Sequence, residues 1–258
     1  MKSKIVAVIQ ARMRSSRFPG KPLEKIGEWS LIELVLRRVS KSSKIEKVIL
    51  ATSSNPNDDI LATHVESLGF PVFRGSENDV LSRFYEAARE YEPLAVVRIT
   101  GDCPLISPSL IDYAIENFAV KNVDYLTISI GEEKERAYPR GFDVEVASFK
   151  ALTEAVENAS KQYEREHVMP YLYTHRDRFS IEYLDPSPDV SRPRYRLCVD
   201  TKKDLEVIMR IYDFFKGKLV DIEYKEIISF LDRNPDVHLI NQSVKQKHYT
   251  ESDKRIVQ

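Results

Sequence analysis

Residues 5–23 read IVAVIQARMRSSRFPGKPL. The first five of them are apolar and lack the polar alternation that a half-exposed strand shows. An uninterrupted apolar run of this length is typical of a strand covered on both faces, as in a parallel sheet. The basic segment that follows is therefore expected at the carboxyl end of a buried strand, where open α/β sheets bind their ligands.

Short apolar runs recur at 48–51 and 95–99, and stretches with helical periodicity lie between the runs. The helical stretches are 31–39, 58–68, 79–91 and 110–118. Ser107 and Pro108 suit the start of the last helix, as its cap and its first helical residue. This order of strands and helices predicts a doubly wound α/β sheet.

The second half of the chain has a different pattern. Strands are expected at 125–130, 142–146, 181–184 and 195–199, and the last of these is expected to return to the central sheet. Helices are expected at 149–159, 163–175, 203–215 and 224–231. No Gly/Ser-rich linker separates the two halves, so residues 1–258 are predicted to form a single domain with an elaborated middle section.

The composition argues against several classes of protein. Lys and Arg number 39 and Asp and Glu number 40, for a formal charge of −1. This balance predicts neither a nucleic-acid polymer nor a membrane surface as a partner. The amino terminus has too few apolar residues for a signal segment or a membrane span. Cys103 and Cys198 form no disulfide framework or zinc motif, and a cytoplasmic location is expected.

The basic segment 10–23 contains no acid and carries four cations, Arg12, Arg14, Arg17 and Lys21. Arginine presents a planar fork to phosphate oxygens, and lysine presents a compact charge. The small hydroxyls of Ser15 and Ser16, with Gly20 allowing close backbone approach, favour a polyphosphate ligand. The segment lacks the Walker A pattern GxxxxGK[ST], and a solvated basic loop is the structural alternative.

Two acids each follow an apolar run. Asp102 stands in RITGDCPL after the run 95–99, and Asp200 stands in RLCVDT at the end of 195–199. Each acid alone is compatible with a turn or a helix cap. Together with a cationic phosphate segment they predict a Mg²⁺ site, because Mg²⁺ commonly uses one or two carboxylates, water and substrate phosphates.

Several motifs, in this order, resemble one family. ARMRSSRFPGKPL (11–23), GDCPLI (101–106) and VDTKKDLE (199–206) are similar to the cytidylyltransferases that make CMP-activated acidic sugars, the CMP-sialic acid and CMP-Kdo synthetases. The SpsF-like branch of spore-coat polysaccharide biosynthesis is the nearer resemblance. It is carried by GSENDVLSRF (75–84), YPRGFDVEVAS (138–148), EREHVMPYLY (164–173) and LINQSVKQK (239–247).

The resemblance implies a Rossmann-like, GT-A-like nucleotidyltransferase fold with a mostly parallel central sheet between helices. It also implies Mg²⁺ dependence, CTP as co-substrate, and an arm inserted at about 130–190 that forms a homodimer or binds the acceptor. By position, it assigns nucleotide binding to Ala11, Arg12, Ser15, Arg17, Lys21, Gly101 and Asp102. Among these, it assigns catalysis to Arg12, Arg17, Lys21 and Asp102, and it assigns metal binding to Asp102 and Asp200.

Further candidates are charged residues with a structural alternative. Asp79 and Arg83 are four residues apart at a helix start, so they either form an ion pair or, by resemblance, contact the base or ribose. The candidates for acceptor binding lie in the middle section and are Arg140, Asp143, Glu164 and His167. The last two belong to a dense charge run that alternatively forms a solvated helix face.

The predicted function is a Mg²⁺-dependent transfer of CMP from CTP to a small anionic acceptor, with release of pyrophosphate, in surface polysaccharide biosynthesis. The acceptor is an acidic sugar, such as a nonulosonic acid, or a phosphate or phosphonate compound. One alternative is a GT-A-type glycosyltransferase, which would need an Asp-x-Asp-like motif where GDC offers a single acid. Another is a non-catalytic subunit that binds CTP and releases no pyrophosphate.

Overall fold

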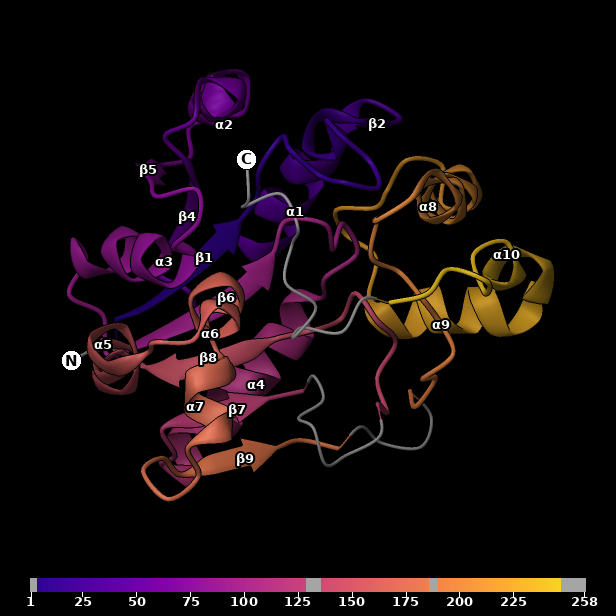
Figure 1. Cartoon of the computed structure of the whole chain (residues 1–258). Coiled ribbons are helices and arrows are strands. Elements are labelled where there is room, and N and C mark those ends of the chain that lie inside the picture. Colours follow the sequence, from indigo (N-terminus) through magenta and orange to yellow (C-terminus); the bar gives the residue numbers. More distant parts are fainter. Residues whose placement is uncertain (1–3, 129–135, 186–189, 247–258) are drawn as a thin grey trace.

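The computed structural model describes residues 4–128, 136–185 and 190–246, and its centre is a seven-stranded sheet (Figure 1). The strand order is β5-β4-β1-β6-β8-β7-β9. β8 pairs antiparallel with both neighbours, β6 and β7, whereas the other pairings in this sheet are parallel. The strands are β1 Ile5–Gln10, β4 Lys47–Ser53, β5 Val72–Gly75, β6 Ala95–Thr100, β7 Tyr125–Thr127, β8 Glu145–Ser148 and β9 Ile181–Tyr183. The predicted α/β class with a mostly parallel sheet is confirmed.

Helices lie on both sides of the sheet (Figure 1). Alternate residues of β1 point to opposite faces: Ile5 and Ile9 pack with α1, α4, α8 and α9, and Val6 and Val8 pack with α3, α5 and α7. The helices are α1 Leu31–Val39, α2 Asp59–Ser67, α3 Val80–Arg89, α4 Pro108–Lys121, α5 Phe149–Asn158, α6 Gln162–His167, α7 Pro170–Thr174, α8 Lys202–Phe214, α9 Tyr224–Arg233 and α10 Pro235–Leu239. No helix within the described ranges has the length and apolarity needed to cross a membrane.

The strand order reverses between β1 and β6. From β1 the chain moves outward to β4 and β5, and then returns to place β6 on the other side of β1. Gln10 at the end of β1 pairs with Thr100 at the end of β6. Loops that leave two neighbouring parallel strands in opposite directions open a crevice at their carboxyl ends. Both chemical motifs of the sequence begin at this crevice.

A buried arginine holds the loop after β6 against α1. The Arg38 side chain is fully buried, and its guanidinium donates to the carbonyl oxygens of Ile106, Leu219 and Ile222. Burial lowers the pKa of Arg38 to about 10. This one side chain therefore ties the loop that contains Asp102 to a segment of the carboxyl-terminal half.

Two predicted elements are wrong. Residues 195–199 form no strand of the central sheet: Arg196 makes one isolated bridge with Arg140, and the backbone N–H of Val199 donates to the carbonyl of Asp102. The reason is that β6 already pairs with β1 on one edge and β8 on the other, so the segment runs past the end of β6 instead. The helix expected at 163–175 is divided into α6 and α7, because Pro170 disfavours a helical conformation before it.

Smaller differences concern strand limits. β5 and the short hairpin β2 Lys25–Ile26 with β3 Trp29–Ser30 were not predicted, and the strand expected at 142–146 begins at Glu145. β5 lies at the sheet edge with no fully buried residue, so its sequence lacks a strong apolar run. Residues 129–135 and 186–189, which include the end of the strand expected at 125–130 and parts of the expected arm, lie outside the described residues.

Candidate functional site

A cleft with a volume of about 290 Å³ opens at the carboxyl ends of β1 and β6. Residues from the segment after β1, the loop after β6, α3 and α6 line it, together with Asp200 and Gln246 from the carboxyl-terminal part. Segments that are distant in sequence therefore contribute to one cleft at the point where the strand order reverses. Open α/β sheets bind ligands at this position.

The basic segment is folded by its own backbone so that its cations reach the cleft. The N–H of Gly20 donates to the carbonyl of Met13 over 2.8 Å, and Gly20 has a φ of 79°. This left-handed conformation is accessible to glycine without the steric cost that a side chain brings. The buried Phe18 anchors the loop, and its N–H donates to the Ser15 hydroxyl. Lys21 then begins a short 3₁₀ turn.

Gly101 lets the two strand ends meet. Its N–H donates to the carbonyl of Gln10 over 2.9 Å, and a Cβ at this position would come within 2.7 Å of the Ala11 Cβ. Any larger residue would push the basic segment away from the loop that carries Asp102. The glycine of the GDCPLI motif is therefore required by the close approach of two backbones.

Lys21 is the centre of the charged end of the cleft. Its Nζ lies 2.8 Å from Oδ2 of Asp102, 2.9 Å from Oδ1 of Asp200 and 2.7 Å from the carbonyl of Val199. Burial would lower the pKa of Lys21, but Asp102 and Asp200 outweigh it and the pKa lies above its ordinary value. Burial would raise the pKa of Asp102, and Lys21 instead keeps it below the ordinary range. Lys21 and Asp102 therefore stabilise each other in their charged forms.

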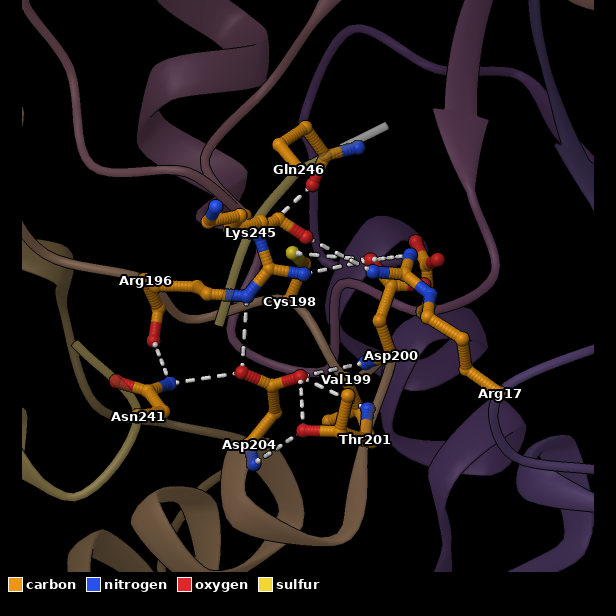
Figure 2. A network of polar contacts seen from close by, with 12 residues as sticks. Arg17, Arg196, Cys198, Val199, Asp200, Thr201, Asp204, Asn241, Lys245 and Gln246 are labelled. Atoms are coloured by element: carbon orange, nitrogen blue, oxygen red, sulfur yellow. Dashed lines mark hydrogen bonds and ion pairs between the residues drawn. The ribbon is translucent and has the colours of Figure 1, made fainter. Parts of the chain in front are cut away.

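Asp200 is surrounded by cations. Its Oδ2 lies 2.8 Å from the guanidinium of Arg17 and 2.6 Å from that of Arg196, while its Oδ1 faces Lys21. Figure 2 shows both arginines converging on this carboxylate. The Arg17 guanidinium also donates to the carbonyl of Lys245, which brings the carboxyl-terminal segment to the rim of the cleft.

A buried carboxylate supports this arrangement from behind. Asp204, which is 1% exposed, accepts from Arg196, from Asn241 and from the backbone N–H groups of Asp200 and Thr201 (Figure 2). Thr201 caps α8, and its hydroxyl also donates to Asp204. The start of α8 thus fixes both the backbone of Asp200 and the arginine that pairs with it.

Replacing Asp204 with asparagine is expected to lower the free energy of unfolding by about 3 kcal/mol, because it removes the buried carboxylate that accepts from Arg196, from Asn241 and from two backbone N–H groups. Urea unfolding followed by circular dichroism measures this. Asp213→Asn, on an exposed position of the same helix, is the matched control and should change stability by less than about 0.5 kcal/mol. Equal stability of the two variants would contradict a supporting role for Asp204.

The α3 side of the cleft contains a second buried cation. Arg83 is 2% exposed and donates to the carbonyl of Ser76, and burial together with the nearby charge of Arg12 lowers its pKa to about 10. The Arg12 guanidinium donates to the carbonyl of Glu77. Glu166 and His167, from the last turn of α6, line the cleft beside α3, since the two helices are in contact.

The cleft gathers most of the predicted residues and leaves out four. Those that line it are Ala11, Arg12, Ser15, Arg17, Lys21, Arg83, Gly101, Asp102, His167 and Asp200. Asp79 caps α3 and pairs with Arg165, and Asp143 pairs with Arg136. The carboxylate of Glu164 accepts from the N–H groups that begin α6, and the Arg140 backbone bonds to the segment 195–197. These placements give no support to ligand contacts of the four, which stay predictions.

Several residues that line or support the cleft were not predicted from the sequence. They are Gln10, Thr100, Glu166, Arg196, Asp204 and Gln246. Gln10 and Thr100 had a usable signal, because each is a polar residue at the end of an apolar strand. Arg196 and Gln246 had none, since their importance arises from contacts between distant segments. The spacing of Thr201 and Asp204 fits a capping box, which is a local signal for the start of α8, but the contact of Asp204 with Arg196 had none.

The donor set at the charged end is compatible with a divalent cation. Oxygens of Asp102 and Asp200 already face one point, which the Lys21 ammonium nitrogen occupies. Within the described ranges there is no group of three or more His, Cys, Asp or Glu residues that could hold a metal ion. Two carboxylates suffice for Mg²⁺ when substrate phosphates and water complete its ligands.

Comparison with known proteins shows the family of this chain. The family model described as cytidylyltransferase matches residues 6–256. The chain belongs to the cytidylyltransferase family. It is 35% identical to the spore coat polysaccharide biosynthesis protein SpsF of Bacillus subtilis over 90% of this chain and 95% of that protein. The resemblance inferred from the motifs is thereby confirmed, and the chain is a nucleotidyltransferase enzyme.

Solved structures show the same fold. A cytidylyltransferase from Leptospira borgpetersenii superposes with a TM-score of 0.84 at 30% identity, covering 95% of this chain and 99% of that one. A CMP:2-keto-3-deoxy-manno-octonic acid synthetase in complex with CTP superposes with a TM-score of 0.62 at 19% identity, over 83% of this chain and all of that one. The predicted nucleotidyltransferase fold is confirmed.

Proposed function

We propose that this cytidylyltransferase transfers CMP from CTP to a small anionic acceptor in a Mg²⁺-dependent reaction that releases pyrophosphate. The observation that carries the proposal is the contact of Lys21 with both Asp102 and Asp200 in a cleft at the carboxyl ends of β1 and β6. Cations for a triphosphate and carboxylates for a metal are thus adjacent. The relationship to SpsF supports a role in surface polysaccharide biosynthesis.

In this proposal the basic segment binds the triphosphate. Arg12, Arg17 and Lys21 neutralise the charge that gathers on the departing pyrophosphate. Arg17 and Lys21 pair with Asp200, and phosphate oxygens of CTP would take over part of the role of this carboxylate. Because the cations are already held in place by Asp200, little ordering is needed on binding.

Asp102 and Asp200 would hold Mg²⁺. When bound, the metal supplies Lewis-acid neutralisation of phosphate charge. The acceptor oxygen attacks the α-phosphorus in line, a new P–O bond forms, and the bond to the β-phosphate oxygen breaks. The protein positions the reactants and screens the approach of one anion to another.

The acceptor is proposed to be an acidic sugar or a phosphate or phosphonate compound. His167 and Glu166 line the cleft on the α6 side, and the proposal assigns the acceptor to this side. His167 donates or accepts a hydrogen bond depending on its protonation. A homodimer through residues of about 130–190 and a cytoplasmic location complete the proposal.

The test is incubation of the protein with CTP, Mg²⁺ and a panel of acidic sugars, phosphates and phosphonates. Release of pyrophosphate and a CMP adduct in mass spectrometry are expected with at least one acceptor. CTP binding without pyrophosphate release from any acceptor would favour the non-catalytic alternative. Consumption of a nucleotide-sugar in place of CTP would favour a glycosyltransferase. Light scattering tests the dimer.

A further inference from the structure

A row of polar side chains in contact with one another crosses the mostly apolar sheet face that α3, α5 and α7 cover. Its members come from four neighbouring strands: Gln10 of β1, Arg98 of β6, Glu145 of β8 and Tyr125 of β7. Arg98 is paired in register with Val8 of β1 on one side and with Glu145 of β8 on the other. Gln10 lies two residues beyond Val8 on β1 and is therefore a diagonal neighbour of Arg98. Tyr125 of β7 is likewise a diagonal neighbour of Glu145. Val6, Val8 and Val96 on the same face belong to the hydrophobic core.

The row is joined by hydrogen bonds from end to end. The Tyr125 hydroxyl donates to Oε1 of Glu145 over 2.6 Å, and Arg98 forms an ion pair with Oε2 of the same carboxylate. Nε of Arg98 then donates to Oε1 of Gln10 over 3.1 Å. The side chains of Arg98 and Glu145 are 12% and 11% exposed. Burying an ion pair costs desolvation free energy, so such a pair contributes little net stability. This pair is therefore better explained by the side chains that it holds in place.

The contact with Arg98 fixes the orientation of the Gln10 carboxamide. A guanidinium has donors and no acceptor, so it accepts nothing from an amide N–H and must face the amide oxygen. The NH₂ group of Gln10 therefore points away from Arg98. It has no partner among the described residues and is absent from their buried, unpaired polar atoms. Since Gln10 lines the cleft, this NH₂ group is an accessible donor there.

We propose that Gln10 is a specificity-determining residue whose fixed N–H groups donate to a hydrogen-bond acceptor on the nucleoside part of the bound nucleotide. This inference rests on the proposed use of CTP. Val80 and Arg83 of α3 line the cleft, and Val80 packs on the sheet face that carries Gln10. A neutral amide beside an apolar side chain suits a nucleoside better than a triphosphate, for which Arg17 and Lys21 are available.

The fixed orientation of the Gln10 carboxamide makes its NH₂ group a more effective hydrogen-bond donor to a ligand. A carboxamide that rotates freely offers either an oxygen or an NH₂ group, and it loses conformational freedom when a ligand selects one. Arg98 has already made this selection, and Glu145 and Tyr125 hold Arg98 in turn. A ring carbonyl oxygen or a ring nitrogen with a lone pair fits this donor, whereas a ring N–H is rejected because two donors would face each other.

The test compares Gln10→Met, Gln10→Glu and the wild type by calorimetric titration with CTP and, separately, with inorganic tripolyphosphate, both with Mg²⁺. Methionine keeps the volume and loses both hydrogen bonds. Glutamate keeps an oxygen for Arg98 and replaces the outward donor with an acceptor. We expect CTP affinity about fivefold weaker for Gln10→Met and at least about tenfold weaker for Gln10→Glu. Tripolyphosphate affinity of Gln10→Met should match the wild type.

Thermal unfolding separates ligand binding from structural support. Gln10→Glu should melt at or above the wild-type temperature, because its bond to Arg98 is charge-assisted, and Gln10→Met should melt lower. CTP affinity is thus expected to fall from the wild type to Gln10→Met to Gln10→Glu. Thermal stability is expected to follow a different order, because Gln10→Glu should be at least as stable as the wild type and Gln10→Met less stable. Gln242→Met, an exposed change far along the chain, is the control and should leave both readouts unchanged.

Each other outcome overturns the proposal. If CTP affinity follows thermal stability, so that Gln10→Glu binds CTP as well as the wild type does, Gln10 only supports Arg98. If Gln10→Met weakens the binding of tripolyphosphate as much as the binding of CTP, Gln10 does not contact the nucleoside. Wild-type protein that binds no CTP would overturn the proposed function as well, whereas equal CTP binding by all variants overturns the role of Gln10 alone.

Discussion

Lys21→Ala is expected to lower the rate of pyrophosphate release at least about a hundredfold, which corresponds to a barrier higher by about 3 kcal/mol. Two effects add. The variant loses a cation that is proposed to bind the triphosphate, and it leaves Asp102 and Asp200 facing each other without the ammonium that lies between them. Two unscreened carboxylates repel a triphosphate. Steady-state kinetics with CTP and the acceptor found by the panel measure the effect.

Lys25→Ala is the matched control for Lys21→Ala. Lys25 lies four residues further along the chain and is exposed, and its ammonium reaches the carbonyl of Glu28 rather than a carboxylate. It should retain the wild-type rate within about twofold. A near-normal rate in Lys21→Ala, with CTP affinity unchanged, would show that the triphosphate binds elsewhere. It would contradict a catalytic role for Lys21.

Asp102→Asn is expected to lower the same rate at least about a hundredfold for a different reason. Asparagine preserves the shape of the side chain but removes the negative charge that would hold Mg²⁺ and that now offsets the burial of Lys21. The pKa of Lys21 should fall toward its ordinary value as a result. Turnover is measured against Mg²⁺ concentration, and a raised Mg²⁺ requirement is the specific sign of a lost metal ligand.

The control for Asp102→Asn is Asp213→Asn, which makes the same chemical change on the exposed side of α8. The double variant Lys21→Ala with Asp102→Asn gives a second check. Residues in direct contact act non-additively, so the double variant should lose much less than the product of the two single losses. Independent, multiplicative effects would contradict a shared role for the two side chains, as would an unchanged Mg²⁺ requirement in Asp102→Asn.

Local sequence patterns predicted the elements that depend on short-range periodicity. The helix expected at 31–39 is α1 without a shifted residue, because its apolar spacing is a local signal, and the structure shows Ser30 capping its start. β1, β4 and β6 were recognised because each contains a short, mostly apolar run in the middle of the sheet, interrupted in β6 by Arg98. The strand expected at 195–199 failed for the same reason, since its apolar residues are buried by packing beyond the sheet rather than by strand pairing.

The charged end of the cleft was also largely predictable. A basic segment after the first strand and acids at the ends of two apolar runs pointed to one phosphate and metal site, and Lys21 contacts both acids. The helix cap role of Glu164 and the pairing of Asp204 with Arg196 were not predictable. A carboxylate in a charge run has the same sequence signal whether it lies in solvent or closes a helix end.

The sequence by itself determined which residue types stand at which strand and helix ends, and with the family motifs it determined the chemistry. Only the tertiary structure decided which of these ends meet. Lys21 and Asp200 are 179 positions apart, and Gln10 and Arg98 are 88 apart. Periodicity encodes the face that a residue occupies on its own element, whereas contact across such separations depends on strand order, register and the packing of whole elements, which no local period specifies.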